Sequence, residues 1–560
     1  MSKAPGDAAK NRRGGDEGGS TDGGTRADAS KADSSKTGGA SKKRSKRRGS
    51  SKKRGKSGES KSSSKPAEAK GSRSKRDAGR PPWWYDLVTT SIRSPVVDNQ
   101  HAIYTNRTLR FEKIKAVGFD FDHTLAIYNT EMLDGLALRL VTDRLIEHEG
   151  MERNWFDDVP DLSFARKGLI VDIELGNVLK TDRHGHVLHA FHGVHKLTSR
   201  EKRESYGETD VIPHVTEGMR FLQMDSAFAK PETCLFSGLA PKVSPGEYRK
   251  LWKKIRQHTD MVHRDGSLKA VITANPHDYL HIDPHTEHLI RWLRKIGKKV
   301  FFLTNSEWEY TCAMINPTLG RLGGPDDLSW LELFDQVVVE GRKPGYFKRV
   351  NPAPASTPGA APNVMRSGNI LELEERLEVG GPQVLYVGDH IYADLISSKR
   401  NTYWRTMLVV PELEEELTVQ SALPGIVQQL KETDERRTIT EREVMHWKAV
   451  EGALGQLQDD RHTELLTRLK EECRDSRSRA MKALNQFIRQ RERLRSRLSQ
   501  ATNQHWGSLF RAGNELTYYG RQLEDFACTY TSRATNLSFY PPNHYFRSAM
   551  DYLPHELESV

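Results

Sequence analysis

The sequence predicts an α/β fold: a parallel sheet with helices on both faces, a large inserted domain and additional C-terminal helices. Three observations lead to this prediction. Apolar runs of strand length alternate with helix-like segments, which is typical of a parallel sheet covered on both faces. About 170 residues separate the first two runs, far more than a connecting loop needs. The chain of 560 residues is also too long for one compact core.

Five apolar runs are expected to form the strands of the sheet. Each is an almost unbroken stretch of aliphatic and aromatic residues, as expected for strands buried on both faces. An amphipathic helix at 285–297 precedes the second strand and is expected to end at Gly297. The strands are expected within residues 115–127, 298–306, 334–341, 382–390 and 402–413.

The insertion between the first two strands is expected to form a cap, residues 131–289, on a catalytic core made of residues 81–130 and 290–415. The cap contains a hairpin-like run at 168–193 and a helix-like segment at 247–263. Within the core, residues 348–370 are rich in Pro, Ala, Ser and Gly and are expected to form a flexible loop.

The C-terminal region, residues 416–560, is expected to be helical and to pack on the core or at a subunit interface. Residues 412–503 are charged and helical in pattern, so their helices are expected to pair with each other, with another subunit, or with their own domain. No run of heptads is sustained, so the pattern does not predict an extended coiled coil.

The N-terminal segment, residues 1–80, is expected to be a disordered basic tail. It contains 24 Lys and Arg against 9 Asp and Glu, a net charge of +15, whereas the whole chain carries +11. The remaining 480 residues are therefore slightly acidic, at −4. With almost no large apolar side chain, the tail cannot offset the entropy of ordering. It suits a polyanion partner such as nucleic acid, polyphosphate or acidic membrane; the alternative is a solubilising tail or a gene-model extension.

The tail has no apolar segment of the kind found in signal peptides, and no stretch of about 18 apolar residues predicts a membrane span. The four cysteines are scattered without a CxxC pair. This argues against a disulfide framework or a structural zinc site, and it suits the reducing environment of the cytoplasm.

Polar residues follow each of the first four predicted strands. In a parallel sheet the carboxyl ends of the strands form one edge, where ligands bind. Any one of these residues is explained equally well as an ordinary turn residue, but four complementary groups are much harder to explain in that way. The residues are Asp120, Asp122 and Thr124, then Thr304, Asn305 and Ser306, then Lys343, then Asp389 and Asp394.

This set of side chains predicts metal-assisted phosphate chemistry. Three or four neighbouring carboxylates would repel one another unless a cation lay among them, and hard oxygen ligands favour Mg²⁺. Lys343 and the hydroxyls and amides of residues 304–306 can receive phosphate oxygens. One aspartate can then attack phosphorus, and a second carboxylate can protonate the leaving oxygen and later activate water.

The motifs DFDHT, TNS, RKP and GDHIYAD resemble those of the haloacid dehalogenase (HAD) superfamily, a group of mostly phosphotransfer enzymes. Longer stretches, among them GFDFDHTLAIYN, VHRDGSLK, FFLTNSEWEYT and WGSLFRAGNELTYYG, resemble the cytosolic purine 5′-nucleotidases that prefer IMP and GMP. The resemblance runs from about residue 100 to residue 556 and leaves out the tail. It implies an HAD-type Rossmann-like core with an inserted cap.

The resemblance also implies roles for the strand-end residues. Asp120 would be the nucleophile and Asp122 the acid/base, with an aspartyl phosphate as intermediate. The implied Mg²⁺ ligands are Asp120, the backbone carbonyl of Asp122, and Asp389, with Asp394 beside them. Phosphate would be held by Thr304, Asn305, Ser306 and Lys343.

A helical segment of the cap carries the implied base-binding residues. Arg256, Asp260 and His263 share one helix face, and without the resemblance they would be interpreted as a surface ion pair with a neighbouring histidine. The resemblance implies that Arg256 and Asp260 read the purine edge, that His263 packs on the ring and that Lys269 lies near the phosphate. Arginine donates to O6 and aspartate accepts from N1–H of a 6-oxopurine, whereas adenine presents the reverse pattern.

One departure concerns base stacking: Val194 stands where the family usually has an aromatic residue, and His195, which follows it, is the candidate replacement. The family also implies a homo-oligomer, a dimer or tetramer, and a nucleotide effector near Tyr392 and Arg400. The expected function is Mg²⁺-dependent hydrolysis of IMP, GMP and their deoxy forms, with phosphotransfer to nucleosides as an added activity. The alternatives are a HAD phosphatase for another phosphomonoester and a nucleic-acid-associated binding protein that acts through the basic tail.

Overall fold

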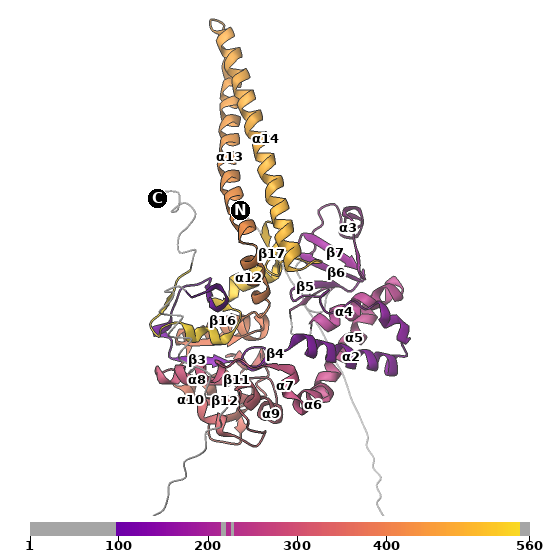
Figure 1. Cartoon of the computed structure of the whole chain (residues 1–560), viewed down its shortest axis with the longest axis vertical. Helices are drawn as coiled ribbons and strands as arrows, with labels where there is room; N and C mark the ends of the chain where they lie inside the picture. The colour runs from indigo at the N-terminus through magenta and orange to yellow at the C-terminus, as the bar shows by residue number, and fades with distance from the viewer. Residues whose placement is uncertain (1–96, 214–219, 226–228, 549–560) are drawn as a thin grey trace, which may run out of the picture. The chain divides into compact units, whose positions relative to one another are not determined.

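A computed structural model describes residues 97–213, 220–225 and 229–548 (Figure 1). The predicted disordered tail, residues 1–80, lies outside these residues, so its state is not tested. None of the helices within the described residues combines the length and the hydropathy needed to cross a bilayer.

The centre of the fold is a nine-stranded, mostly parallel sheet, which confirms the predicted α/β class. Neighbouring strands run parallel from β19 to β14, and the edge strands β1 and β13 run antiparallel. The predicted strands are β3, β11, β12, β15 and β16. In spatial order the sheet is β1 (Tyr104–Thr105), β19 (Thr529–Thr531), β16 (Arg405–Val409), β15 (Val384–Gly388), β3 (Ala116–Phe119), β11 (Lys299–Leu303), β12 (Gln336–Val339), β14 (Val364–Arg366) and β13 (Thr357–Pro358).

Two features of the sheet differ from the sequence interpretation. The segment expected to be a flexible loop, 348–370, contains β13 and β14, and β14 extends the sheet beyond β12. That prediction was wrong because a three-residue strand is too short to show a periodic pattern. The C-terminal region, predicted as helical, also supplies β19, which pairs with β16 inside the core sheet.

Both faces of the central strands are buried, as their unbroken apolar runs predicted. Phe302 and Val337 belong to one hydrophobic cluster, and Phe301 and Val338 to another on the opposite face. Gly118 in β3 is required by this packing, since a Cβ there would lie 2.0 Å from the Phe301 ring. The predicted helix before β11 is α8 (Thr286–Lys295), and Gly297 follows it with a positive φ of 79°.

The cap begins and ends at a short antiparallel pair, β4 (Ile127–Tyr128) with β10 (Leu280–His281). Its sheet is antiparallel, in the order β8, β7, β6, β5, β9. Figure 1 shows α2, α4 and α5 together beside this sheet. The strands are β5 (Leu169–Asp172), β6 (Asn177–Thr181), β7 (Val187–His192), β8 (His195–Lys196) and β9 (Phe221–Met224); the helices are α2 (Thr130–Glu149), α3 (Ser199–Tyr206), α4 (Ala229–Leu239), α5 (Tyr248–Arg264), α6 (Ser267–Ala274) and α7 (Pro276–Tyr279).

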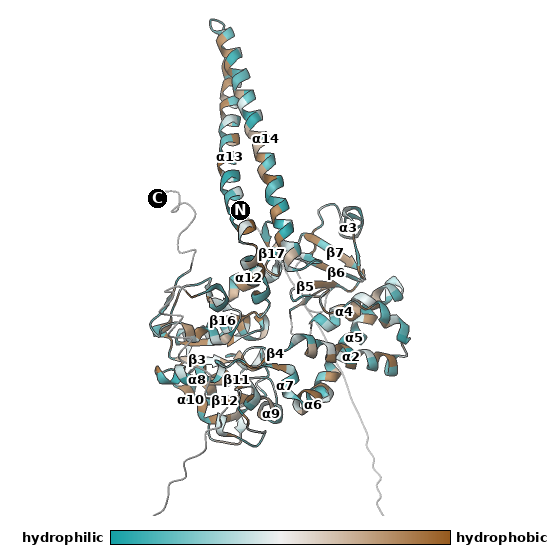
Figure 2. Cartoon of the chain, in the orientation of Figure 1, coloured by the Kyte–Doolittle hydropathy of each residue, from teal (hydrophilic) through white to brown (hydrophobic). Residues whose placement is uncertain are grey.

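After β16 the chain forms α12 (Leu413–Ala422) and then two long helices, α13 (Pro424–Gln456) and α14 (Thr463–Thr502). Of the expected arrangements, α13 and α14 pair with each other as an antiparallel hairpin (Figure 1). Ion pairs of Asp434 with Arg491 and of Glu451 with Arg477 link the two helices. Figure 2 shows hydrophilic and hydrophobic residues interleaved along both of them.

The last described segment returns the chain to the core. A short hairpin of β17 (Arg511–Ala512) and β18 (Glu515–Leu516) leads to α15 (Tyr518–Phe526) and then to β19. A final strand, β20 (Tyr545–Phe546), pairs antiparallel with β2 (Leu109–Arg110).

Candidate active site

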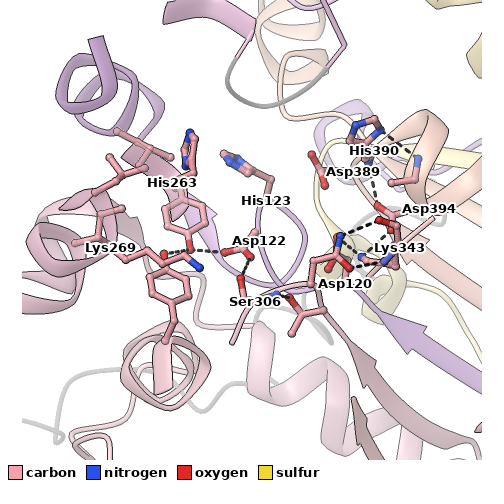
Figure 3. Close-up of a pocket in the computed structure, with 18 residues that line it drawn as sticks. Asp120, Asp122, His123, His263, Lys269, Ser306, Lys343, Asp389, His390 and Asp394 are labelled. Atoms are coloured by element: carbon pink, nitrogen blue, oxygen red, sulfur yellow. Dashed lines mark hydrogen bonds and ion pairs between the residues drawn. The ribbon is translucent and has the colours of Figure 1, made fainter. Parts of the chain in front are cut away.

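The carboxyl ends of the central strands meet at one cavity of about 320 Å³ (Figure 3). Its wall on the sheet side comes from the ends of β3, β11 and β15 and from the loop after β12. The pairing register explains why these groups meet: Phe119 is level with Val387 on one neighbour and with Phe302 on the other. The lining residues are Asp120, Asp122, His123, Tyr128, Leu133, His263, Leu268, Lys269, Ile272, Thr304, Asn305, Ser306, Tyr310, Lys343, Asp389, His390, Ala393 and Asp394.

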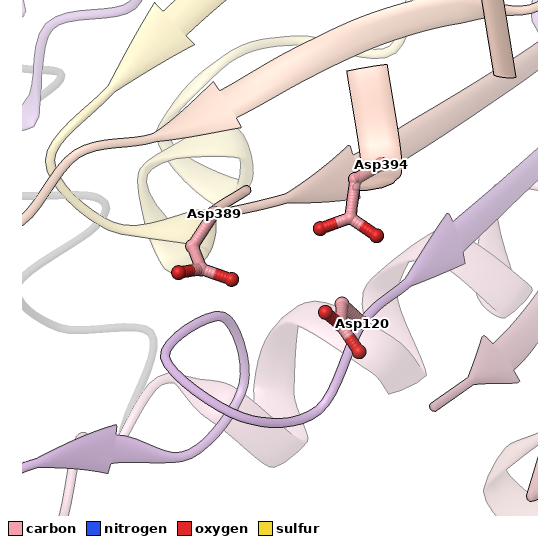
Figure 4. A group of neighbouring side chains, drawn as sticks. All are labelled: Asp120, Asp389 and Asp394. Atoms are coloured by element: carbon pink, nitrogen blue, oxygen red, sulfur yellow. The ribbon is translucent and has the colours of Figure 1, made fainter. Parts of the chain in front are cut away.

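Three carboxylates form a compact, buried group in this cavity: Asp120, Asp389 and Asp394 each place an oxygen within 4.8 Å of the others (Figure 4). Burial raises the pKa of Asp120 well above its usual range; Lys343 opposes this rise, whereas Asp394 and Asp389 add to it. When ionised, the three carboxylates carry a total charge of −3, and the Lys343 ammonium contributes +1. The remaining −2 matches a divalent cation, and an all-oxygen donor set matches Mg²⁺. The residues present therefore fit the predicted metal.

Lys343 contacts two of these three carboxylates directly. Its Nζ lies 2.7 Å from Asp120 Oδ2 and 2.8 Å from Asp394 Oδ1, and it donates to the Tyr386 hydroxyl at 3.1 Å. Burial disfavours its charged form, but Asp120 and Asp394 more than compensate and raise the pKa of Lys343 above its ordinary value. The side chain is therefore a fixed positive charge next to the predicted nucleophile.

The carboxylate of Asp122 lies apart from this group and has different partners (Figure 3). The Tyr128 hydroxyl donates to its Oδ1 at 2.6 Å, and Ser306 Oγ donates to its Oδ2 at 2.7 Å. Between the two aspartates, Phe121 is buried and packs near Phe302 with ring centres 5.3 Å apart. The two carboxylates therefore occupy different environments although only one residue separates them.

Side chains of the loop after β11 make hydrogen bonds within the protein that hold the site in shape. Thr304 is buried, and its Oγ1 accepts the backbone N–H of Ser306 at 3.1 Å. The Asn305 side chain exchanges two hydrogen bonds with the backbone of Lys343: it accepts from the N–H at 2.6 Å and donates to the carbonyl at 3.2 Å. Asn305 therefore holds the loop that carries Lys343.

The opposite wall of the cavity comes from the cap. The predicted helix 247–263 is α5, which brings His263 to the cavity, and Lys269 follows in α6. Burial lowers the pKa of His263 to about 4, so its ring is neutral near pH 7. Lys269 pairs with Glu307, and its Nζ lies 5.0 Å from the centre of the Tyr310 ring.

Arg256 and Asp260 share the predicted face of α5 but do not line this cavity. Arg256 Nε lies 3.5 Å from Asp260 Oδ1, and Arg256 also bonds the buried carboxylate of Glu232. His195, in β8, is exposed and lies 3.5 Å from Glu201, and Val194 is exposed beside it.

The two predicted effector residues lie outside the cavity as well. Tyr392 is half-exposed in a π-helix, Ile391–Ile396. The Arg400 guanidinium lies 5.4 Å from the centre of the Phe526 ring.

Several residues in or near the cavity were not predicted from the sequence, among them Tyr128, His123 and Lys167. Tyr128 reaches Asp122 because β4 turns back after the first strand, a geometry that no spacing rule reveals. His123 adopts a left-handed φ of 57°, and burial lowers its pKa. Lys167 comes from the cap and places Nζ 3.9 Å from Asp389. For His123 a signal existed, since it lies directly beside the aspartate pair in DFDHT.

Comparison with known proteins agrees with the resemblance seen in the motifs. The model of the "5' nucleotidase family" matches residues 103–558. "5'-nucleotidase domain-containing protein 2" of Homo sapiens is 28% identical over 499 residues, covering 84% of this chain and 88% of its own. The rat protein of the same name is 28% identical over 500 residues, covering 84% and 82%.

A solved structure, a 2-haloacid dehalogenase from Pseudomonas syringae pv. Tomato DC3000, matches 53% of this chain and 87% of its own. It does so at 14% identity and a TM-score of 0.20, a likeness too slight to support any inference. The family match spans the sheet, the cap and the C-terminal helices, so the chain belongs to the 5' nucleotidase family and is a phosphoric monoester hydrolase of nucleotides.

Proposed function

We propose that this protein hydrolyses purine nucleoside 5′-monophosphates with Mg²⁺, and that it prefers IMP, GMP and their deoxy forms. One observation supports this proposal above all: Asp120 lies with Lys343 in the carboxylate group, while Asp122 is held apart by Tyr128 and Ser306. Two aspartates with different partners suit two different roles in phosphate transfer.

In the proposed first step, Asp120 attacks phosphorus, the bond from phosphorus to the 5′ oxygen breaks, and Asp122 protonates that oxygen as the nucleoside leaves. In the second step Asp122 takes a proton from water, which attacks the aspartyl phosphate and releases phosphate and free Asp120. Lys343 stabilises the ionised form of Asp120 and the negative charge on the phosphoryl oxygens. A Mg²⁺ ion held by Asp120, Asp389, Asp394 and the carbonyl of Asp122 would supply further positive charge there.

The base preference is proposed to depend on Arg256 and Asp260, whose side chains already lie side by side. A 6-oxopurine can accept from the first at O6 and donate to the second from N1–H. Adenine would offer neither group a hydrogen-bond partner on the base, which can reduce kcat/KM by roughly 10⁴-fold at a site built on hydrogen bonds. His263, Lys269 and the exposed His195 are proposed to contact the remainder of the nucleotide.

A phosphate-release panel tests the proposal. Wild-type protein with Mg²⁺ is given IMP, GMP, AMP, CMP and UMP, beside p-nitrophenyl phosphate, which has no base. We expect the highest kcat/KM for IMP and GMP, and no turnover of any substrate by Asp120→Asn. Equal kcat/KM for IMP and AMP would refute the base preference, and undiminished turnover by Asp120→Asn would refute the nucleophile.

The remaining expectations are also proposals. We propose a cytoplasmic location, which the four free, buried cysteines suit. A homo-oligomer with a nucleotide effector near Tyr392 and Arg400, and phosphotransfer to nucleosides, follow from the family resemblance. Binding of a polyanion by residues 1–80 follows from their net charge of +15.

A further inference from the structure

A fully buried carboxylate in the cap, that of Glu232, forms an ion pair with Arg256. Glu232 lies in α4, a helix whose residues are almost all buried, and α4 packs against α5. The Glu232 carboxylate accepts from Arg256 Nη1 at 2.9 and 3.1 Å, one bond to each oxygen. Glu232 is 0% exposed, whereas the Arg256 side chain is 49% exposed. The pair therefore ties one end of a half-exposed guanidinium to the interior of the cap.

A buried ion pair is weak evidence for stability, so a further reason for this pair is needed. Burial raises the pKa of Glu232 to about 7, although Arg256 opposes the rise. A carboxylate with this pKa is costly to keep ionised at neutral pH, and buried ion pairs can often be replaced by apolar residues without loss of stability. An apolar pair, however, could not hold a guanidinium in one orientation.

The tie to Glu232 also determines which donors of Arg256 remain for a ligand. Nη1 bonds Glu232, and Nε lies 3.5 Å from Asp260. Within the described part of the chain, Nη2 makes no hydrogen bond to the protein. A planar guanidinium fixed at two of its nitrogens presents the third in a fixed direction beside the Asp260 carboxylate. A donor beside an acceptor is the pattern complementary to O6 and N1–H of a 6-oxopurine.

We propose that Glu232 is a positioning residue for substrate specificity, which orients Arg256 so that Arg256 and Asp260 together select 6-oxopurine nucleotides. This inference rests on the proposed function and deepens it. Glu232 itself would not touch the nucleotide; it would act through Arg256. Its loss should therefore change KM and base discrimination rather than kcat.

Glu232→Gln provides the test, because glutamine keeps the shape and one acceptor but removes the charge. Charge-assisted hydrogen bonds are roughly twice as strong as neutral ones, so we expect KM for IMP to rise about tenfold and the IMP-to-AMP ratio of kcat/KM to fall about tenfold. In the matched control Glu174→Gln, the lost partner is Arg249, two turns earlier on α5, at 2.8 Å and at the surface. The control should leave both quantities unchanged.

A double-mutant cycle separates positioning from a structural role. If Glu232 acts through Arg256, Glu232→Gln should have no further effect on the IMP-to-AMP ratio in an Arg256→Met background. Should Glu232→Gln fail to fold, Glu232→Asp replaces it, since aspartate keeps the charge but withdraws the carboxylate from Arg256 Nη1 by one methylene; it should show the same loss of discrimination. Additive effects in the cycle, or an unchanged ratio in Glu232→Gln or in this substitute, would overturn the proposal.

A binding measurement keeps this test separate from the proposed function. IMP and AMP are titrated into wild type and each variant, and the dissociation constants are read from thermal shifts. If wild type binds IMP more tightly than AMP but releases no phosphate, the proposed function fails, while the Glu232 proposal is still decided by the variants. If wild type binds the two nucleotides equally, the Glu232 proposal is overturned whatever the turnover.

Discussion

Lys343→Met is expected to destabilise the protein, to slow turnover and to make its stability depend strongly on Mg²⁺. The Lys343 ammonium lies 2.7 Å from Asp120 and 2.8 Å from Asp394, and all three side chains are buried. Methionine fills most of the same volume but leaves two carboxylates without their cation. Removing one partner of a buried ion pair costs about 3–5 kcal/mol of unfolding free energy.

The expected change in melting temperature follows from the size of the protein. At about 2.1 cal/mol/K per residue, the roughly 440 residues that the structure describes give an unfolding entropy of about 0.9 kcal/mol/K, so the melting temperature should fall by about 3–5 °C. Mg²⁺ at a hundred times its dissociation constant adds about 2.7 kcal/mol to the unfolding free energy, which should raise the melting temperature again by about 3 °C. The variant should gain more from Mg²⁺ than the wild type, where an ammonium already neutralises one of the carboxylates.

The assay is a thermal melt in EDTA and in Mg²⁺, beside steady-state phosphate release. Loss of a charged donor from the site should lower kcat by about 10²–10³-fold. Lys298→Met is the matched control: Lys298 is also buried, but its ammonium bonds the carbonyls of Phe111 and Ile114 at 2.9 and 2.6 Å. The control should lose stability without new Mg²⁺ dependence. A Lys343→Met variant with the wild-type melting temperature in EDTA, or with wild-type turnover, would refute the reasoning.

Three further predictions concern other parts of the chain. Tyr128→Phe removes the 2.6 Å hydrogen bond to Asp122 and should lower kcat about tenfold with KM unchanged. The control Tyr310→Phe should lower kcat less, since the Tyr310 hydroxyl contacts Tyr128 and not Asp122. Equal kcat values for wild type and Tyr128→Phe would contradict the role of Tyr128. Burial lowers the pKa of Lys180 from 10.5 to about 7, so the unfolded chain binds more protons between these pH values and stability should rise with pH across that window. In Lys180→Met the melting temperature should rise less steeply with pH across the same window. A melting temperature that depends on pH as steeply as in the wild type would disprove the role of Lys180. Removal of residues 1–80 should leave melting and nucleotidase turnover unchanged but abolish salt-sensitive binding to a single-stranded oligonucleotide, and loss of turnover would show that the tail is part of the enzyme.

Much of the core could be predicted from the sequence because its signals are local. Unbroken apolar runs located β3, β11, β12, β15 and β16, and the polar residues directly after them supplied the residues of the cavity. Short strands such as β14 and β19 could not be found, because two or three residues carry no period and their pairing is set by neighbours distant in the sequence. The helical character of residues 412–503 was predicted, but the choice among pairing with each other, with another subunit or with their own domain depends on tertiary packing.

The surroundings of the residues proposed to bind the base were less predictable for a different reason. The neighbours of Asp120 and Lys343 come from the strand ends of the sheet, whereas Arg256 is bonded by a residue of α4. Spacing along α5 correctly placed Arg256, Asp260 and His263 on one helix face, but it could not show that Glu232 binds the guanidinium from a helix 24 residues earlier. Tyr128 was missed in the same way, since its contact with Asp122 depends on the return of the chain at β4.

The strand order explains why we expect the proposed chemistry at the carboxyl end of β3. From β3 the chain proceeds outward on one side through β11, β12 and β14, and then crosses to the other side of β3 to form β15 and β16. The connections on the two sides of β3 therefore lead in opposite directions and leave a crevice beyond its carboxyl end, the position where ligands bind in open α/β sheets. Asp120 and Asp122 come directly after β3, Asp389 follows β15 on one side and Thr304 follows β11 on the other. Because the cap is inserted between β3 and β11, it leaves the sheet at this same crevice, which is why α5 and α6 can supply the opposite wall. The order of the strands thus accounts for both halves of the proposed site: charged side chains from the sheet, proposed to hold the phosphate, and side chains from the cap, proposed to contact the nucleoside.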